Sequence, residues 1–504
     1  MSLAIVRSRA QDGIHAPPVS VEVHLGNGLP SFTLVGLPEA AVRESRERVR
    51  AALVNAGFEF PMRRITVNLA PADLPKDGGR FDLPIALGIL AASGQVPAAA
   101  LESREFLGEL ALDGHLRAVH GVLPSVWQAH RDGHGCILPA ENGAEAALVD
   151  QADVRIAKHL LEVCAALRGE VELHAASPTT PLGSDRKTVE EDLADVRGQP
   201  LARRALEIAA AGGHNLLMVG PPGTGKTMLA RRLPGILPPM REEEAMESAM
   251  IWSVSSQGFD PGQWRRRPFR DPHHTSSGVA LVGGGSYPRP GEVSLAHHGV
   301  LFLDELTEFD RRVLEVLREP LETGEVSISR AARQARFPAR FQLVAAMNPC
   351  PQGYDCDLQA NCRCTPAQQE RHRARLSAPF LDRIDLQIEV PRQDPRELAG
   401  LAPGEPSATV RARVVQARER ALARQGCINA RLSGALLDRH CRLTAGDRGF
   451  LDQAIARLRL STRAHHRILR VARTIADLAA EEAIDRAHLA EALGLRAFEK
   501  LSPR

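Results

Sequence analysis

Residues 220–227 carry the most specific chemistry in the chain. They read Gly-Pro-Pro-Gly-Thr-Gly-Lys-Thr and fit the pattern G-x-x-x-x-G-K-[ST] at every fixed position. In this pattern glycines let successive backbone N–H groups turn toward phosphate oxygens, the lysine reaches the β- and γ-phosphates, and the hydroxyl binds Mg²⁺. The sequence therefore predicts an ATP-binding loop formed by Gly220, Pro221, Pro222, Gly223, Thr224, Gly225, Lys226 and Thr227. A Gly/Pro turn that fits the pattern by chance is the competing interpretation.

The segments on either side of this loop occur in the order that phosphate binding requires. The apolar run 215–219 predicts a buried strand before the loop, and 228–234 predicts the first turns of a helix after it. A helix N-terminus adds a partial positive charge and unpaired N–H groups, both of which favour a bound anion. The flanks thus support nucleotide binding rather than a simple turn.

Two acidic residues follow a second apolar run. Residues 299–303 predict a buried strand, and Asp304 and Glu305 come directly after it. Beside a phosphate loop, Asp304 is expected to hold Mg²⁺ directly or through water, and Glu305 is expected to polarise the attacking water as general base. The alternative is a strand that simply ends in two acidic residues.

A third apolar run, 341–347, ends at Asn348. Ligands of parallel α/β sheets sit at the carboxyl ends of the strands, so the Asn348 amide is expected to hydrogen-bond the γ-phosphate or to orient water. Asparagine before Pro349 is also typical of a turn, which is the competing interpretation.

Two arginines are candidates for stabilising charge in the transition state. Arg383 lies between a predicted helix and a predicted strand, where it could enter the nucleotide site of a neighbouring subunit. Several arginines lie in the predicted helical run 461–470, and Arg463 is the one expected to reach back to the γ-phosphate. Arginines on a helix are often only solvated, and the sequence does not decide which of these senses ATP.

Composition places these motifs in a multidomain globular chain. Its 504 residues are 44% hydrophobic and 25% charged, which is enough for more than one buried core. No apolar run is long enough to span a bilayer and the N-terminus lacks a signal-peptide pattern, so a cytoplasmic protein without a membrane partner is expected. The net charge is +2, but residues 401–504 hold 19 Lys and Arg against 11 Asp and Glu. This excess suits a polyanionic partner, and a solvated helical surface explains it equally well.

The order of elements predicts an α/β fold in four segments. Residues 1–176 alternate strand-like and helix-like runs, and 177–194 have the composition of a linker. A second α/β block covers 195–392, and 393–504 form a helical region with one apolar stripe at helical spacing. The stripe consists of Ile468, Val471, Ile475 and Leu478.

Four of the eight cysteines fall within fifteen residues. They are Cys350, Cys356, Cys362 and Cys364. Four thiolates suffice for a tetrahedral Zn²⁺ site, although the spacing is irregular and lacks a C-x-x-C pair. A structural zinc site and reduced thiols are therefore equal alternatives, with His372 as a candidate replacement ligand.

Several longer strings resemble the AAA+ ATPases of the magnesium-chelatase branch, and most closely the YifB/ComM family. The strings include 36–39, 67–76, 81–87, 267–274, 289–297 and 471–478. The resemblance covers nearly the whole chain. It implies a Lon-protease-like N-terminal domain, an AAA+ core and a C-terminal helical lid. It also implies a homo-hexameric ring with ATP sites between subunits, in which Arg383 acts on the neighbour's nucleotide.

The resemblance also bears on the partner and on two insertions. Members of this family are linked to natural transformation, where ComM acts as a DNA branch-migration motor. One insertion covers about 253–291, and the other is a hairpin within 324–340. In a ring, arginines of the hairpin would grip DNA phosphates without reading sequence. They are Arg330, Arg333, Arg336 and Arg340. A surface hairpin with solvated arginines is the alternative.

In the N-terminal region, residues 75–78 resemble the turn before the catalytic serine of Lon-type proteases. Alignment puts Arg80 in the place of that serine and Ser125 in the place of the catalytic lysine. Neither nucleophile nor base is retained, so peptidase activity is not expected.

Three functions compete on these observations. The first is an ATP-driven motor that moves on branched or single-stranded DNA without sequence preference. The second is a chelatase-like motor that remodels a protein partner, although the chain has no D-x-S-x-S metal-adhesion motif. The third is a nucleotide-dependent scaffold, which the general base expected at Glu305 disfavours.

Overall fold

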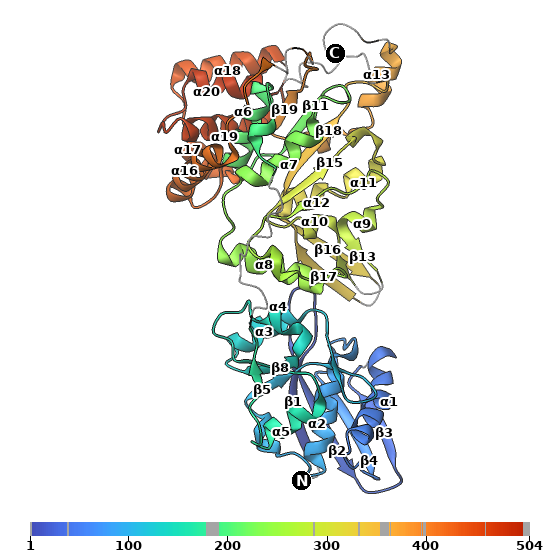
Figure 1. The fold of residues 1–504 in the computed structure, drawn as a ribbon. Helices are drawn as coiled ribbons and strands as arrows, with labels where there is room; N and C mark the ends of the chain where they lie inside the picture. The colour runs from blue at the N-terminus through green and yellow to red at the C-terminus, as the bar shows by residue number, and fades with distance from the viewer. Residues whose placement is uncertain are drawn as a thin grey trace. The chain divides into compact units, whose positions relative to one another are not determined.

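The computed structural model forms two compact units (Figure 1). The first unit contains Met1–Arg186, Met246–Trp264 and Ser329–Phe337, and the second contains Lys187–Ala245, Arg265–Ile328 and Pro338–Arg504. The first unit therefore takes in two segments whose sequence neighbours belong to the second. Within these units the structure describes residues 3–37, 40–177, 191–285, 288–330, 333–352, 362, 364–394, 396, 400–458 and 460–496.

The first unit is built on a mixed sheet of eight strands in the order β10-β9-β8-β5-β1-β2-β4-β3. β1 pairs antiparallel with β2, with Leu3 opposite His24, whereas β3 pairs parallel with β4. Residues of β1, β2 and β4 alternate between buried and more exposed positions, as in a sheet with one face on a core. The strands are β1 (Leu3–Arg9), β2 (Pro18–Gly26), β3 (Ser31–Val35), β4 (Arg64–Ala70), β5 (Arg104–Phe106), β8 (Gly135–Pro139), β9 (Val154–Ala157) and β10 (His174–Ala175), and β6 (Glu109–Leu110) and β7 (Leu116–Arg117) form a separate pair.

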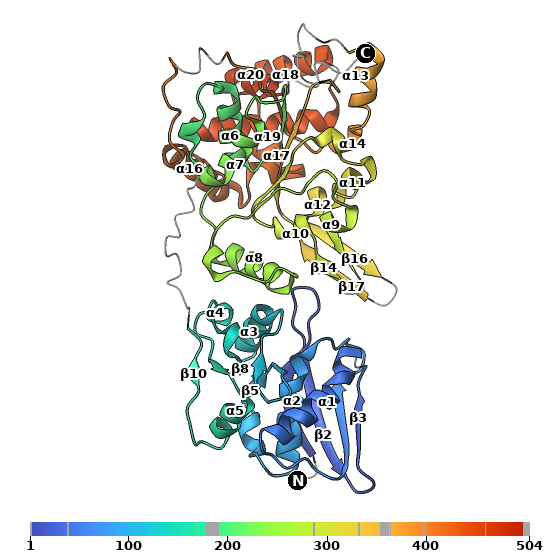
Figure 2. The ribbon, with the colours of Figure 1, turned by 45° about the vertical axis from the view of Figure 1, so that its right-hand side comes forward.

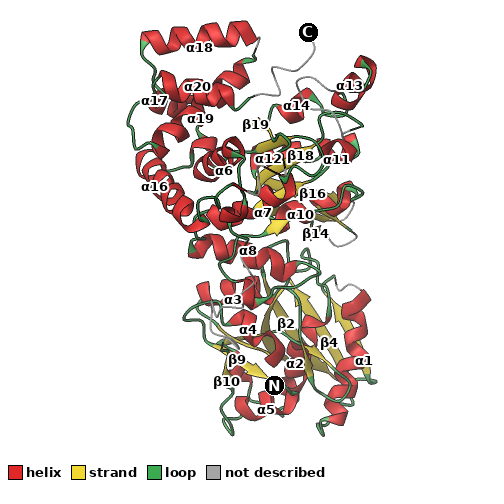
Figure 3. Cartoon of the chain, turned by 45° about the horizontal axis from the view of Figure 1, so that its top comes forward, coloured by secondary structure: helices red, strands yellow, loops and turns green. Residues whose placement is uncertain are grey.

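Helix α2 lies on this sheet, and α1 packs against α2 (Figure 3). α2 is buried along its whole length and packs against β1 and β2. Gly88 permits this packing, because a side chain there would lie 2.4 Å from Val23 Cγ2. The helices of the unit are α1 (Ala40–Asn55), α2 (Asp82–Ala92), α3 (Val122–Arg131), α4 (Gly143–Ala146) and α5 (Leu160–Leu167).

The segment Met246–Trp264 is part of the first unit through apolar and polar contacts. Three of its apolar residues share a buried cluster with residues of α3 and α4. At the start of α3, the Gly121 N–H donates to the Ser253 carbonyl at 3.0 Å, and the Leu123 N–H donates to the Ser253 hydroxyl at 3.3 Å. A helix N-terminus leaves such N–H groups unpaired, so a segment distant in sequence caps α3.

The second unit contains a parallel sheet of five strands in the order β12-β15-β18-β11-β19. Every residue of β11, β15 and β18 is buried, as in α/β folds whose sheets are covered on both faces. The three apolar runs of the sequence are therefore neighbouring strands. The five strands are β12 (Phe269–Arg270), β15 (Val300–Leu303), β18 (Gln342–Met347), β11 (Leu216–Val219) and β19 (Leu386–Glu389).

Helices and two hairpins connect these strands. α8 (Glu242–Val254) begins in the second unit and ends in the first. The other helices are α6 (Pro200–Gly212), α7 (Lys226–Ile236), α9 (Gly278–Val282), α10 (Glu292–Leu295), α11 (Arg311–Glu315), α12 (Arg318–Thr323), α13 (Pro366–Arg373) and α14 (Ala378–Leu381). The hairpins are β13 (Gly283–Gly284) with β14 (Arg289–Pro290), and β16 (Glu325–Arg330) with β17 (Arg333–Pro338).

The C-terminal helices group beside α6 (Figures 1 and 2). In α19, three residues of the predicted stripe, Ile468, Val471 and Ile475, are buried in the core that the helices share with β11 and β18. His214 Nε2 lies 2.8 Å from Thr474 Oγ1 and adds a polar link to the same core. The α/β organisation with a helical C-terminal region is confirmed. The helices are α16 (Ser407–Gln425), α17 (Gly434–His440), α18 (Ala445–Leu458), α19 (Thr462–Leu478) and α20 (Arg486–Gly494).

None of the helices in the described ranges combines the length and the apolar character needed to cross a bilayer.

Candidate active site

The phosphate loop joins β11 to α7 in a conformation that its glycines permit. Gly223 and Gly225 have φ of 78° and 87°, in the left-handed region that favours glycine. A side chain at Gly220 would lie 2.2 Å from the Val390 carbonyl oxygen, because the loop passes close to the end of β19. α7 begins at Lys226, so its first backbone N–H groups lie at the loop. The predicted strand, loop and helix occur in that order.

The Lys226 side chain is folded onto the loop and is 8% exposed. Its ammonium donates to the carbonyl oxygens of Gly220 at 2.7 Å and Pro221 at 2.8 Å, and to Asn348 Oδ1 at 3.3 Å. Burial lowers the pKa of Lys226, and the two carboxylates that follow β15 oppose this shift. A hydrogen bond from a buried ammonium to an anion is stronger than one to a neutral oxygen. Replacing the carbonyl and amide partners of Lys226 by a phosphate would therefore stabilise its charge, so the loop fits a phosphate group.

Oxygen atoms suited to Mg²⁺ meet beside this lysine. The Thr227 hydroxyl, in the first turn of α7, donates to Asp304 Oδ2 at 2.6 Å. Asp304 follows β15, which is separated from β11 only by β18. Because Mg²⁺ prefers hard oxygen ligands, this hydroxyl and carboxylate fit the ion that the sequence predicts.

Glu305 has a backbone conformation that is rare outside glycine. Its φ is 50°, and its own backbone N–H donates to Asp304 Oδ1 at 2.9 Å. Such left-handed residues concentrate at functional sites, where the surrounding fold holds them in place. The Glu305 carboxylate is half-exposed and its Oε2 lies 3.2 Å from His274 Nδ1. A carboxylate that is both oriented and open to water can act as a general base.

Sequence reasoning missed His274. It follows β12, and β12 pairs with β15, so both residues lie at the carboxyl ends of neighbouring strands. The His274 ring also lies 4.1 Å from the ring of His273, measured between centroids. The family-like string 267–274 ends in these two histidines, but the strand pairing is what connects His274 with Glu305.

Asn348 directly follows β18, the strand between β15 and β11. Its side chain accepts from Lys226, and its carbonyl oxygen lies 3.1 Å from His372 Nε2. The structure thus brings Lys226, Thr227, Asp304 and Asn348 together at the carboxyl end of three adjacent parallel strands, with Glu305 beside them. This end of the sheet is where α/β proteins bind their ligands.

The two candidate arginines lie at the opposite, amino end of the sheet. Arg383 is ion-paired with Glu322, and its carbonyl accepts from Asn215 Nδ2, just before β11, at 2.9 Å. Arg463 is largely exposed and lies 3.6 Å from Asp382 Oδ2. Four strand residues span about 13 Å. The structure therefore does not bring Arg383 or Arg463 to the phosphate loop of the same chain.

Three of the four clustered cysteines converge. The sulfur atoms of Cys350, Cys362 and Cys364 all lie within 4.8 Å of one another. Cys356 lies outside the described residues. The ring of His372, the candidate replacement ligand, is engaged through Nε2 with the Asn348 carbonyl.

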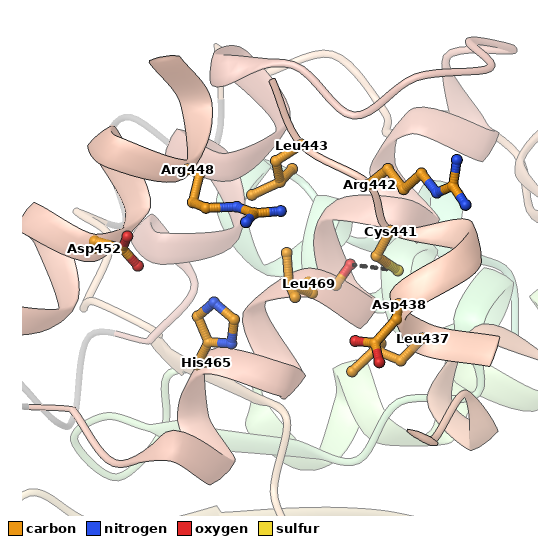
Figure 4. A pocket seen from close by; sticks show the side chains of 9 residues that line it. All are labelled: Leu437, Asp438, Cys441, Arg442, Leu443, Arg448, Asp452, His465 and Leu469. Atoms are coloured by element: carbon orange, nitrogen blue, oxygen red, sulfur yellow. Dashed lines mark hydrogen bonds between the residues drawn. The ribbon is translucent and has the colours of Figure 1, made fainter. Parts of the chain in front are cut away.

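A separate pocket of about 410 Å³ lies among the C-terminal helices (Figure 4). Its polar residues mix both charge signs, and the buried Cys441 thiol donates to the Leu469 carbonyl. Burial raises the pKa of Cys441 to about 12, so this thiol is not a nucleophile at neutral pH. The lining residues are Leu437, Asp438, Cys441, Arg442, Leu443, Arg448, Asp452, His465 and Leu469. None of the predicted site residues is among them.

Three family models match the chain in succession. Residues 21–142 match "Subunit ChlI of Mg-chelatase", 192–398 match "Magnesium chelatase, subunit ChlI", and 404–496 match "Magnesium chelatase, subunit ChlI C-terminal". The second match covers the phosphate loop, both acids and Asn348.

Similar proteins extend over the full length. A protein named YifB from Salmonella typhimurium is 53% identical over 505 residues, covering 99% of this chain and 98% of that protein. Competence protein ComM from Haemophilus influenzae is 54% identical over 506 residues, covering 99% of each chain. The magnesium-chelatase 38 kDa subunit of Cereibacter sphaeroides is 26% identical over 218 residues, covering 40% of this chain and 58% of that protein. On this identity, the chain belongs to the YifB/ComM family of magnesium-chelatase-like AAA+ ATPases.

Proposed function

We propose that this chain is an ATP-hydrolysing ring motor that moves on branched or single-stranded DNA without reading its sequence. One observation supports the ATPase part above all. Lys226, Thr227, Asp304, Glu305 and Asn348 follow three adjacent parallel strands and meet at one end of the sheet. Membership of an AAA+ family supports the same conclusion.

Each of these side chains has a task that suits its geometry. The Lys226 ammonium leaves its carbonyl partners for the terminal phosphates, and the neighbouring Asn348 amide hydrogen-bonds the γ-phosphate. Thr227 and Asp304 would hold Mg²⁺, which when bound neutralises charge on the transferring phosphoryl group. Glu305 orients the attacking water and accepts its proton.

The ring part of the proposal rests on the arginines. Because the length of a strand separates Arg383 and Arg463 from their own phosphate loop, they would act on nucleotide held by a neighbouring subunit of a homo-hexamer. Arg383 would exchange the Glu322 carboxylate for a phosphate, one anionic partner for another. Arg463 would exchange Asp382 in the same way.

The DNA part rests on a relative's name and on the β16–β17 hairpin. The relative from Haemophilus influenzae is named a competence protein. The side chains of Arg336 and Arg340 are exposed, whereas the intervening Phe337 is buried. Those of Arg330 and Arg333 lie outside the described side chains. Exposed guanidinium groups bind phosphates without reading bases, which suits a motor that moves along any sequence.

The proposal assigns a role to each segment of the chain. Residues 1–176 would form a Lon-protease-like domain, 177–194 a linker, 195–392 the AAA+ core and 393–504 the helical lid.

We infer that the N-terminal domain has no peptidase activity. Arg80 is buried and donates to the side chain of Gln11 and to the His120 carbonyl. The Ser125 hydroxyl donates to the Gly121 carbonyl at 3.1 Å. A guanidinium group is not a nucleophile, and this hydroxyl has no base beside it among these contacts.

Two assays on the full chain test the proposal. ATP turnover is measured with and without a four-way DNA junction, and junction movement is followed with fluorophores on opposite arms. We expect the wild type to hydrolyse ATP and move the junction, and Lys226→Ala to do neither. Turnover without DNA binding or junction movement would refute the DNA motor and leave the ATPase.

The matching family models favour one further candidate, a motor that remodels a protein partner. In that case turnover would be stimulated by a protein and not by DNA. A Glu305→Gln variant held in the ATP-bound state would retain such a partner during affinity purification, whereas Lys226→Ala would not.

A further inference from the structure

Three cysteine side chains meet close to the segment that follows Asn348. Cys350 comes two residues after Asn348, and Cys364 precedes Thr365, the N-cap of α13. Cys350 and Cys364 are buried, while Cys362 is partly exposed. The three sulfur atoms all lie within 4.8 Å of one another. A tetrahedral site with Zn–S bonds of about 2.3 Å requires sulfur atoms about 3.8 Å apart, so only a small inward shift separates this cluster from that geometry.

The other buried cysteines differ from this cluster. Cys136, Cys164 and Cys441 lie on separate elements, and burial raises the pKa of each to about 12. Isolated buried thiols of this kind act as small apolar side chains. Apolar packing alone does not require thiols to lie together, because isolated buried cysteines pack equally well. It therefore does not explain why these three thiols, two of them buried, converge. Convergence points instead to a shared ligand.

We propose that Cys350, Cys362 and Cys364 bind one Zn²⁺ ion in a structural site. Each thiol loses its proton on binding, and the three thiolates take three of the four tetrahedral positions. Water or a further side chain occupies the fourth. The chemistry is that of a soft thiolate set, which selects zinc over Mg²⁺ or Ca²⁺.

The position of the cluster gives the metal a mechanical role. Cys350 extends from the end of β18, and Cys364 extends from the start of α13. A metal bound to both therefore ties the strand to the helix. α13 also carries His372, whose Nε2 lies 3.1 Å from the Asn348 carbonyl. The metal and this hydrogen bond together would fix the backbone of Asn348, whose side chain contacts Lys226.

Metal content of the full chain, purified without chelator under anaerobic conditions, tests the site. We expect about one zinc per chain by mass spectrometry of the metal. Cys362→Ser should lower that content at least tenfold. Cys427→Ser, the matched control at another partly exposed cysteine, should leave it unchanged. Cobalt loaded in place of zinc should give the thiolate-to-metal absorption band in the wild type and in Cys427→Ser only.

Several results would overturn the site. Wild-type protein without zinc and without the cobalt band would do so, as would a disulfide among the three cysteines in the anaerobic protein. Equal zinc in Cys362→Ser and Cys427→Ser would also refute it. If Cys362→Ser fails to fold, the wild-type cobalt spectrum still decides, because it needs no variant. None of these measurements depends on ATP turnover or on DNA.

Discussion

The two ends of the five-stranded sheet carry opposite sets of polar side chains. At the carboxyl end, one lysine lies among a threonine, an asparagine and two acids, which is a set suited to a nucleotide and its Mg²⁺. At the amino end, Arg383, Arg463 and Arg467 face carboxylates, chiefly those of Asp382 and Asp385. Strands of about 13 Å keep the two sets apart.

The separation of the two sets suggests how a nucleotide site would receive its arginines. Among the residues that meet at the carboxyl end, Thr227 and Asp304 supply oxygen atoms suited to Mg²⁺, and Lys226 is the cation beside them. At the amino end, Arg463 and Arg467 are paired with the carboxylates of Asp382 and Asp385. A parallel sheet cannot fold its ends together, so the proposed function has Arg383 and Arg463 act on nucleotide bound to another chain.

The largest expected effect is at the carboxyl end. Glu305→Gln keeps the shape of the side chain but removes the base, so ATP turnover should fall about 1000-fold while ATP binding is retained. Phosphate release and binding of a fluorescent ATP analogue measure the two properties. Turnover within threefold of the wild type would show that Glu305 is not the base.

The second prediction tests whether an arginine from the amino end of one chain acts on the nucleotide at the carboxyl end of another. If Arg383 acts on the neighbour's nucleotide as proposed, Arg383→Ala removes a charge that stabilises the transition state, and turnover should fall about 100-fold. Mixing Arg383→Ala chains with inactive Lys226→Ala chains should restore part of it, because one chain supplies the loop and the other the arginine. Lack of restoration, in mixtures shown by size to form joint assemblies, would place Arg383 in its own chain's site or outside catalysis.

The third prediction concerns the stability of the amino end. Burial raises the pKa of Asp385, but the hydrogen bond and charge of His214 and the charge of Arg467 lower it overall. A carboxyl whose folded pKa is depressed stabilises the fold above its unfolded pKa, and this stabilisation is lost as pH falls through the folded value. Asp385→Asn should therefore cost about 2 kcal/mol at pH 7 and less below pH 4.

Thermal unfolding at both pH values measures this effect. Asp150→Asn, at an exposed carboxylate, is the control and should change neither value. A destabilisation of Asp385→Asn that is the same at both pH values would mean that the charge of Asp385 contributes nothing.

The smallest expected effect is at His274. His274→Ala removes the contact with Glu305 and should lower turnover about fivefold, since one hydrogen bond contributes about 1 kcal/mol. His274→Asn keeps a donor and should recover part of the loss. His273→Ala serves as the neighbouring control and should change turnover less than His274→Ala does. An unchanged rate in His274→Ala would show that the contact does not orient the base.

Local sequence predicted the parts of the site that local structure forms. The phosphate loop is one contiguous segment, and each apolar run became a strand with its polar residue at the carboxyl end. The fold class followed from the alternation of such runs. These predictions needed only neighbours in sequence, because glycine torsions and strand burial are set within a few residues.

Other features depended on strand order and could not be predicted in this way. His274 meets Glu305 only because β12 pairs with β15. Arg463 is expected to reach back to a γ-phosphate, and only the tertiary structure shows that α19 places it beside Asp382 at the amino end. Likewise, nothing in Met246–Trp264 indicates that it belongs with the N-terminal unit, where Ser253 caps α3.

The sequence by itself thus determined the chemistry that one loop and three strand ends can perform. The tertiary structure alone decided which end of the sheet each arginine occupies, which histidine lies beside Glu305, and which cysteines meet. The physical reason is that contacts between residues far apart in the chain depend on the pairing of whole elements, and a one-dimensional pattern of apolar residues fixes that pairing only weakly.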